Sequence, residues 1–169
     1  MRDMRLLRWL RGSALFVAGM FVGTLILQPA ATPQERSSGL KLNHFGIYVK
    51  DMDESKNFYT KQIGFREVFS FKDGAGNPID YFQISRDTFL EMTPATADHP
   101  PGFSHVGIWA DDLGATVTEL RSRGVKVEDI RVGGTKAPLT NVFDPNGAKL
   151  ELLAYPPESL QRKAMDAWK

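Results

Sequence analysis

The 169-residue sequence contains no cysteine. This absence excludes a disulfide framework, a thiolate nucleophile and a cysteine-rich zinc site. An excess of charge of one sign is also missing, because 21 basic and 20 acidic residues leave a net charge of +1. Five of the arginines fall within residues 1–39, so the remainder is close to neutral. A neutral body gives no electrostatic reason to expect a nucleic-acid partner.

Short catalytic motifs are missing as well. The sequence has no GxSxG nucleophile elbow, no P-loop and no HExxH zinc motif. The stretch Gly133-Gly134-Thr135-Lys136 is rich in glycine, but no strand-to-helix pattern surrounds it, so we expect a loop near the mouth of a site. Lys136 and Arg131 could contact an anionic substrate there, although solvated surface charge is the simpler interpretation.

Only one long hydrophobic run occurs, and it lies near the N-terminus. Arginines within residues 2–11 precede an uncharged stretch at residues 12–27, and a polar linker follows. This order is typical of a targeting segment, so residues 1–39 are kept outside the predicted fold. A cleaved signal peptide and an uncleaved anchor that holds the protein on the membrane both fit. Under either hypothesis we expect an exported domain, periplasmic or anchored facing the extracytoplasmic side.

The rest of the sequence contains an internal repeat. Asn43-His44-Phe45-Gly46-Ile47-Tyr48 recurs about sixty residues later as Ser104-His105-Val106-Gly107-Ile108-Trp109, and each copy is followed by aspartate. A glutamate follows each copy at nearly the same distance, Glu91 in the first half and Glu151 in the second. Such self-similarity indicates one supersecondary unit used twice. We therefore expect the functional site where the two halves meet.

Each half is predicted to fold as a strand, a helix and three further strands. In the first half the helix spans residues 53–62 and ends at Gly64. In the second half the helix spans residues 112–123, with Ala115, Val117 and Leu120 facing inward. A strand at residues 125–130 follows, and the last two strands pair through Asn146-Gly147. Leu160, Ala164 and Trp168 predict an amphipathic helix in the tail, residues 156–169.

These patterns resemble the vicinal oxygen chelate superfamily, which includes glyoxalase I, bleomycin- and fosfomycin-resistance proteins, methylmalonyl-CoA epimerase and extradiol dioxygenases. The resemblance covers residues 40–155 and rests on the two His-x-Gly-Ile strands, on Ile63-Gly64-Phe65 and on residues 143–152. It implies an α+β fold of two βαβββ modules, residues 40–93 and 103–155, whose curved mixed sheet forms a cup. It also implies a homodimer, with sites within or between chains.

The resemblance places metal ligands on the first and last strand of each module, at His44, Glu91, His105 and Glu151. The residues themselves agree, because the two glutamates lie in apolar strand sequence, where an unpaired carboxylate costs several kcal/mol. One divalent ion (Zn, Ni, Co, Mn or Fe) would neutralise them, and the glycine near each histidine would leave room for a ligand. In the alternative, each glutamate hydrogen-bonds a neighbouring histidine in a metal-free cup. The third histidine, His99, is expected at the surface.

The His, Glu, His, Glu set is most similar to that of glyoxalase I. It implies a metal-dependent lyase or isomerase that transfers a proton on a small substrate chelated through vicinal oxygens, with Glu91 and Glu151 as catalytic residues. Tyr48 and Ala95 stand where bacterial relatives bind glutathione, so the resemblance does not extend to the glutathione-binding positions. An extradiol-type dioxygenase and a metal-free protein that sequesters a small molecule are the alternatives. The residues expected to form an aromatic substrate-binding surface are Tyr48, Phe82, Trp109 and Tyr155.

Overall fold

The computed structural model describes residues 39–169, and its strands form one mixed eight-stranded sheet, as predicted. The first module comprises β1 (Leu40–Val49), α2 (Met52–Asn57), the π-helical turn η1 (Phe58–Ile63), β2 (Arg66–Lys72), β3 (Pro78–Ser85) and β4 (Thr88–Pro94). The second comprises β5 (Gly102–Ala110), α3 (Leu113–Ser122), β6 (Arg131–Val132), β7 (Pro138–Phe143) and β8 (Lys149–Leu153), and α4 (Leu160–Asp166) follows it.

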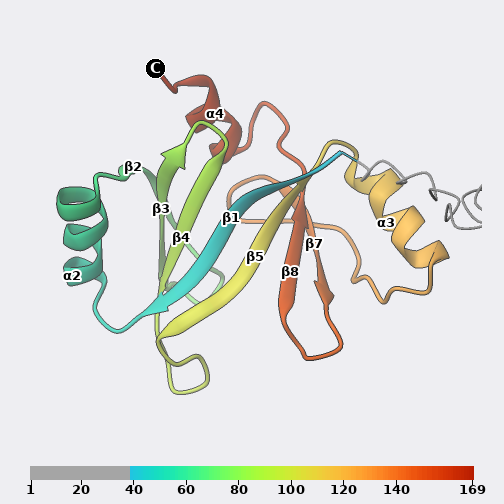
Figure 1. The fold of residues 1–169 in the computed structure, drawn as a ribbon, viewed down its shortest axis with the longest axis horizontal. Helices are drawn as coiled ribbons and strands as arrows, with labels where there is room; N and C mark the ends of the chain where they lie inside the picture. Colours follow the sequence, from blue (N-terminus) through green and yellow to red (C-terminus); the bar gives the residue numbers. More distant parts are fainter. Residues whose placement is uncertain (1–38) are drawn as a thin grey trace, which may run out of the picture. The chain divides into compact units, whose positions relative to one another are not determined.

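The two modules meet edge to edge at the centre of the sheet. The strand order is β2-β3-β4-β1-β5-β8-β7-β6, with β1 antiparallel to β5. Within each module the first strand runs parallel to the last, β1 beside β4 and β5 beside β8. Figure 1 shows β1 and β5 side by side, with α2 and α3 at opposite ends of the sheet. The four strands that carry the predicted ligands are therefore neighbours.

The repeated aspartates begin the two helices. Asp51 accepts a hydrogen bond from the backbone N–H of Glu54, and Asp112 accepts one from Ala115, each at 2.9 Å. These side chains satisfy N–H groups that have no partner inside a helix, which is why aspartate is favoured at this position. At the other end of the first helical segment, Gly64 adopts a φ of 91°, which the absence of a side chain permits.

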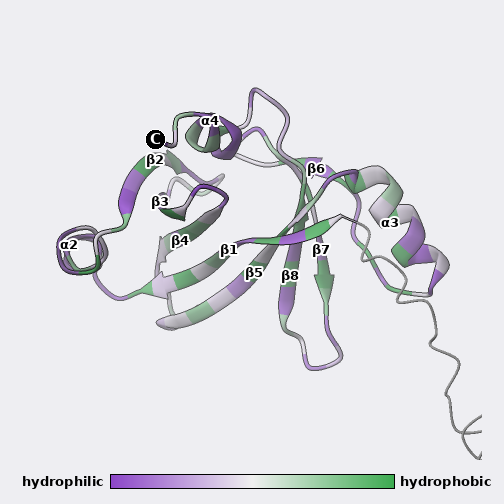
Figure 2. Cartoon of the chain, turned by 45° about the horizontal axis from the view of Figure 1, so that its top comes forward, coloured by the Kyte–Doolittle hydropathy of each residue, from purple (hydrophilic) through white to green (hydrophobic). Residues whose placement is uncertain are grey.

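The sheet buries apolar side chains on both faces. Outside the cup, one cluster that includes Phe82 and Leu90 packs with Met52 and Tyr59, and another that includes Leu152 packs with Leu113 of α3. Inside the cup, a third cluster contains Tyr81, Phe89, Leu139, Leu153 and Tyr155 together with residues of α4. Figure 2 shows the sheet curving from β3 round to β7, with α4 over the open side.

Helix α4 joins the two modules across this open side. Its Leu160 N–H donates to Thr135 O at 3.0 Å, and its Ala164 carbonyl accepts from Gln83 and Arg66 at 3.4 Å. The predicted tail helix is thus present, but Trp168 does not belong to its buried face. The helix ends at Asp166, so Trp168 lies beyond it and is 39% exposed beneath the Arg66 guanidinium.

Two other predictions about local structure are wrong. The strand expected at residues 125–130 is reduced to a single bridge between Val127 and Val142. The side chain of Arg121 donates to the carbonyls of Val127 and Glu128, so these groups are not free to form a ladder. On α3, Ala115 is exposed, because the buried face runs through Leu113, Thr116 and Val117.

Within residues 39–169 no helix is long and apolar enough to cross a membrane. The hydrophobic run at residues 12–27 lies outside the described residues. The targeting segment and the export of the domain therefore stay predictions.

Gln161 of α4 yields a test of the packing. This residue is fully buried, and neither polar atom of its amide has a hydrogen-bond partner among the described residues. Because such atoms lose their hydration without compensation, Gln161→Met should raise the free energy of unfolding by about 1–3 kcal/mol. Urea unfolding with an unchanged m-value would measure this change.

Gln83 is the matched control for this substitution. It is equally buried, but its amide donates to Arg86 O at 2.8 Å and accepts from Arg66. Gln83→Met should therefore destabilise the protein, since it removes hydrogen bonds that the wild-type amide makes. A loss of stability in Gln161→Met equal to that in Gln83→Met would show that the Gln161 amide is bonded after all.

Candidate metal centre

The four predicted ligands converge at the middle of the sheet, within one chain. His44 lies on β1, Glu91 on β4, His105 on β5 and Glu151 on β8, and one ligand atom of each lies within 4.8 Å of the others. The two Nε2 atoms are 3.0 Å apart. The Oε2 atoms of the two glutamates lie 3.6–3.9 Å from these nitrogens. The sequence could not decide between a site within a chain and one between chains. The structure assembles all four residues within one chain.

The register of the central strands explains this convergence. Across the antiparallel pair, His44 stands opposite Gly107 and His105 stands opposite Gly46. In the parallel pairs, Glu91 stands beside Gly46 and Glu151 beside Gly107. Residues in register point to the same face of a sheet, so both histidines and both glutamates enter the cup.

The glycines of the repeat were expected to leave room for a ligand, but they leave room for the two histidine rings. A Cβ atom on Gly107 would lie 2.0 Å from Nδ1 of His44, and a Cβ on Gly46 would lie 2.4 Å from Nδ1 of His105. Each glycine therefore makes room for the imidazole of the other module, and not for a ligand in the cup. Each His-x-Gly copy thus supplies one histidine ligand and one glycine over which the histidine of the other copy packs.

Asn43 and Ser104, which the sequence analysis missed, hold the two imidazoles. Asn43 is an extra residue between two paired positions of β1, and Ser104 is the corresponding extra residue of β5. Such β-bulges re-aim side chains. Asn43 Oδ1 lies 3.2 Å from Nδ1 of His44, and Ser104 Oγ lies 2.9 Å from Nδ1 of His105. The available signal was a small polar residue before the histidine in both copies of the repeat.

Asn43 is itself held in place. It is fully buried, its Oδ1 accepts a hydrogen bond from the Tyr155 hydroxyl at 2.5 Å, and its Nδ2 donates to Asp87 O at 2.8 Å. Its amide orientation is thus fixed with the oxygen toward His44, whose Nδ1–H must be the donor. The Nε2 lone pair of His44 then points into the centre, and the Asn43 oxygen that accepts from its Nδ1–H raises the basicity of this ring.

The two carboxylates have opposite electrostatic environments. Burial is the main cause that raises the pKa of Glu91 above its ordinary value, although His44 and the Tyr81 hydroxyl, which donates to its Oε2, act against it. Burial also acts to raise the pKa of Glu151, but the hydrogen bond and charge of His44, with His105 and Lys149, outweigh it and lower this pKa to about 2. Burial and the neighbouring His44 lower the pKa of His105 to about 3. Glu91 is thus the carboxylate that more readily takes a proton.

The geometry of the cluster fits a divalent cation. Metal–ligand distances of about 2.0–2.2 Å place neighbouring ligand atoms roughly 3–3.5 Å apart in octahedral or tetrahedral coordination. The two Nε2 atoms, 3.0 Å apart, lie in this range, and the carboxylate oxygens lie slightly beyond it, at 3.6–3.9 Å from the nitrogens. At 3.0 Å the two Nε2 atoms can share a proton, or both can turn their lone pairs to one cation. These four residues could therefore hold one ion.

A cavity of about 370 Å³ adjoins this centre. Tyr81, Glu91 and Glu151 line it together with residues from the two edges of the sheet, at β2 and at the β6–β7 turn. Arg131 lines the cavity, whereas Lys136, also suggested by the sequence, does not. Tyr81 was missed by the sequence analysis, since nothing in its strand distinguishes it from the neighbouring Phe82.

None of the four aromatic residues predicted to bind substrate lines this cavity. Phe82 is fully buried in the cluster outside the cup, because Tyr81 pairs with Glu91 and the next residue must face the other way. The ring of Tyr48 stacks on exposed His99 at 4.9 Å. Trp109 packs edge-on against Tyr155 inside the cup, and the Tyr155 hydroxyl is bonded to Asn43.

The model of the Glyoxalase/Bleomycin resistance protein/Dioxygenase superfamily matches residues 41–152. The chain belongs to this superfamily. The match spans most of both modules, including all four residues of the metal centre, and confirms the resemblance inferred from the repeat.

Relatives in this superfamily have several names. The uncharacterized protein YaeR of Escherichia coli is 34% identical over 125 residues, which are 68% of this chain and 96% of that protein. The probable chloroplastic lactoylglutathione lyase of Arabidopsis thaliana is 31% identical over 69% of this chain, which spans only 36% of the plant protein. Methylmalonyl-CoA epimerase from Mycobacterium tuberculosis shares the fold, with a TM-score of 0.64, 22% identity, and coverage of 72% of this chain and 93% of the epimerase.

Gly107→Ala tests the reciprocal packing. The new methyl group would displace the His44 ring, so we expect metal affinity to fall by about 10–100-fold, as for other disturbances of ligand orientation. Gly114→Ala is the control, because a Cβ there lies 3.5 Å from its nearest neighbour. Competition with a chromophoric chelator and elemental analysis would measure the affinity. Equal affinities in the two variants would contradict the role assigned to Gly107.

Ser104→Ala tests the support of the imidazole. Loss of the hydroxyl frees the His105 ring to turn, so metal affinity should fall by about 10–100-fold. Ser104→Thr keeps the hydroxyl and should bind metal as the wild type does. If the alanine and threonine variants bind equally well, Ser104 does not orient His105.

Proposed function

We propose that this protein is a metal-dependent lyase or isomerase that moves a proton on a small substrate bound through two adjacent oxygens. One observation carries the proposal: two histidines and two carboxylates converge on one centre, and only one of the carboxylates, Glu91, accepts a hydrogen bond from a tyrosine hydroxyl at the wall of the cavity. Unequal surroundings are typical of carboxylate pairs that divide acid–base roles, and the pKa values of Glu91 and Glu151 are shifted in opposite directions. Membership of the superfamily and relatives named lactoylglutathione lyase support the same reaction class.

His44, His105, Glu151 and Glu91 would hold the ion, with Zn, Ni, Co, Mn and Fe all compatible with nitrogen and carboxylate ligands. When bound, the ion supplies Lewis acidity that draws electrons from the chelating oxygens and so acidifies the hydrogen on the adjacent carbon. The lowered pKa of His105 keeps its imidazole neutral near pH 7, which is the form that binds a metal.

Glu91 is the proposed proton carrier. Its raised pKa brings it nearer to the working pH, where a group both accepts and returns a proton efficiently. The Tyr81 hydroxyl donates to its Oε2 and orients the carboxylate at the edge of the cavity. Glu151, whose pKa is about 2, stays anionic and is better suited to remain a ligand. The catalytic role predicted for both glutamates is therefore divided between them.

The cavity walls would shield this transfer from water. Phe71, Ile79, Leu139 and Leu153 supply apolar surface around the two glutamates. A poorly solvated site strengthens electrostatic effects on the reacting carbon. Tyr48 supplies no cation at the position where bacterial relatives bind glutathione, so we expect activity without added thiol. Export of the domain and its assembly as a homodimer remain predictions.

Glu91→Gln tests the proton carrier. An amide oxygen still coordinates, so the variant should retain metal, yet exchange of solvent deuterium into the carbon next to the carbonyl should fall by about 10²–10⁴-fold. The assay would use dihydroxyacetone without oxygen or thiol and follow exchange by NMR. Glu151→Gln is the comparison, and we expect it to weaken metal binding first.

Three outcomes would contradict this function. Exchange that is equal in Glu91→Gln and wild type would remove the role of Glu91. Oxygen uptake with a catechol, unaffected by the substitution, would favour the dioxygenase alternative. Failure of the wild type to retain any divalent ion after reconstitution would leave the metal-free binding protein.

A further inference from the structure

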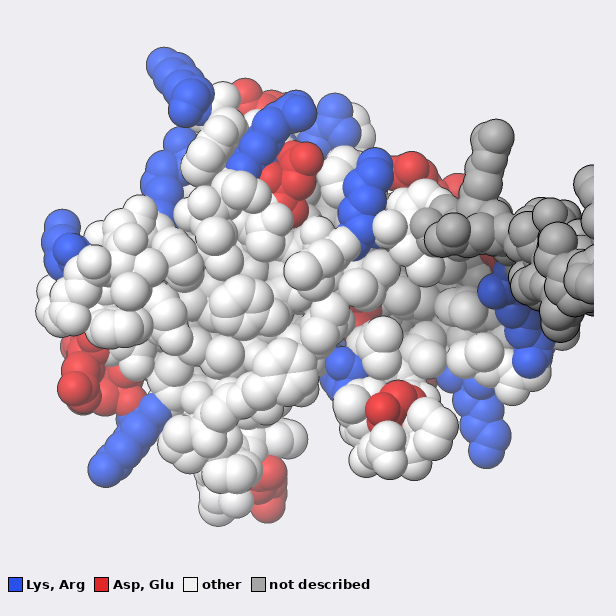
Figure 3. Space-filling view, viewed as in Figure 1, with Lys and Arg blue, Asp and Glu red and all other residues white. Residues whose placement is uncertain are grey.

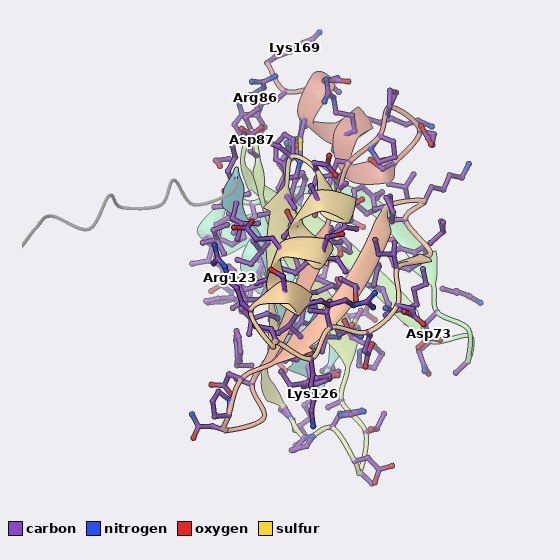
Figure 4. The ribbon with its side chains drawn as sticks, turned by 90° about the vertical axis from the view of Figure 1, so that its right-hand side faces the viewer. Asp73, Arg86, Asp87, Arg123, Lys126 and Lys169 are labelled. Atoms are coloured by element: carbon purple, nitrogen blue, oxygen red, sulfur yellow. The ribbon has the colours of Figure 1, made fainter. Side chains whose placement is uncertain are left out.

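The cavity beside the metal centre has three cations in its walls. Lys72, Arg131 and Lys149 line it, with Asp73 as the only carboxylate besides the two glutamates of the centre. The Asp73 carboxylate is engaged in its own turn, where it accepts hydrogen bonds from the backbone N–H groups of Ala75 and Asn77 at 2.8 Å. Figure 4 shows Asp73 in this turn, at the edge of the molecule.

Lys149 is the cation nearest to the centre. It precedes Glu151 by two residues on β8, so both side chains project into the cup. Its Nζ lies 4.0 Å from Glu151 Oε1, too far for a hydrogen bond, and its side chain is 31% exposed. Across the described residues, Lys72 and Arg131 form no ion pair. The three cations thus have donors to offer to a bound group.

The positive charges in the cavity walls are not balanced unless an anionic group binds there. A divalent ion would offset Glu91 and Glu151, so the remaining walls would carry the charge of three cations against one aspartate. Elsewhere, basic side chains stand around the rim of the molecule and are spread among acidic ones, as Figure 3 shows for one face. Within the partly enclosed cavity, attraction for an anion is stronger than at an open surface.

The cavity is also narrow. The two edges of the curved sheet approach each other here, since a Cβ atom on Gly134 of the β6–β7 turn would lie 2.5 Å from the Phe71 ring at the end of β2. The volume of about 370 Å³ is near the lower end for small-molecule sites. A compact molecule fills such a space, whereas a long cofactor-linked substrate would extend well outside it.

We propose that Lys149, assisted by Arg131, binds an anionic group of the substrate, which is a compact α-hydroxycarbonyl compound with a phosphate or carboxylate a few bonds from its chelating oxygens. This inference rests on the proposed function, because it takes the metal centre as the position of the chelating end. It assigns Lys149 to substrate specificity. The simpler role for Lys149, compensation of the Glu151 charge, would show itself as a loss of metal affinity in a neutral variant.

The test compares matched probes on the full-length protein loaded with Co²⁺. Dihydroxyacetone and dihydroxyacetone phosphate share one chelating unit and differ by the phosphate, and 5-hydroxy-4-oxopentanoate carries a carboxylate instead. Dissociation constants would come from calorimetry and from the visible absorption of Co²⁺. We expect at least one anionic probe to bind ten-fold or more tightly than dihydroxyacetone, and the preferred anion distinguishes phosphate from carboxylate.

Lys149→Gln should abolish this preference, while its affinity for dihydroxyacetone and its metal content stay as in the wild type. Lys126→Gln is the charge-matched control, because Lys126 does not line the cavity and extends from the loop below α3 in Figure 4. Arg131→Gln should reduce the preference in part, and added salt should weaken it in the wild type.

Equal affinity for the neutral and anionic probes would overturn the anion subsite, as would a preference that survives in both Lys149→Gln and Arg131→Gln. Loss of metal from Lys149→Gln would assign the lysine to the metal centre instead. The proposed function is tested separately from the anion subsite. Deuterium exchange on dihydroxyacetone without any anion preference would support the proposed function and overturn the anion subsite. An anion preference without exchange would overturn the proposed function alone.

Discussion

The antiparallel pairing of β1 with β5 is the contact on which the rest of this molecule depends. In that pairing each module places its histidine over the glycine of the other, so the two imidazoles fit side by side only when each lies opposite a residue without a side chain. A slip by one residue would place the two imidazoles on opposite faces of the sheet and set larger side chains opposite positions where glycines now stand. The pairing of β1 with β5 therefore assembles the site as the sheet forms, and their register restricts the positions of both histidines at once.

This arrangement concentrates charge where burial is costly. Two carboxylates and two imidazoles lie in a space from which water is largely excluded, so without a cation the centre opposes folding and must be held by its surroundings. The surroundings are rigid: bulged Asn43 and Ser104 fix the rings, Tyr81 fixes one carboxylate, and α4 closes the open side of the cup. A site built on central strands, with its supports in the same strands, keeps its geometry before any ligand arrives.

Much of this could be predicted from the sequence because it depends on a repeat. Duplicated histidines and glutamates at matching intervals indicated two modules, the ligand set and the meeting of the halves. The wrong predictions concern which residues of a single strand face the cup, and whether a strand forms at all. A β-bulge changes which residue faces inward without a distinct sequence signal, so the roles of Asn43 and Ser104 stayed hidden. Phe82 and Tyr81 are adjacent aromatics, and only the register with Glu91 shows which of them enters the cup. At residues 125–130, Arg121 occupies carbonyls that a ladder needs, which no local pattern reveals.

The two modules are alike at the ligands and unlike around them, and this difference supports the separate roles proposed for the two glutamates. Tyr81 stands opposite Glu91, whereas the equivalent partner of Glu151 is Asn141, whose amide donates to Glu128 at 2.7 Å. Phe89 stands beside His44, whereas Lys149 stands beside His105. A fully symmetric cup would give its carboxylates equal proton affinities and could not assign one as carrier and one as ligand. The exchange of an aromatic pair on one side for polar and cationic residues on the other breaks that equality, and it places the cation Lys149 in the second module.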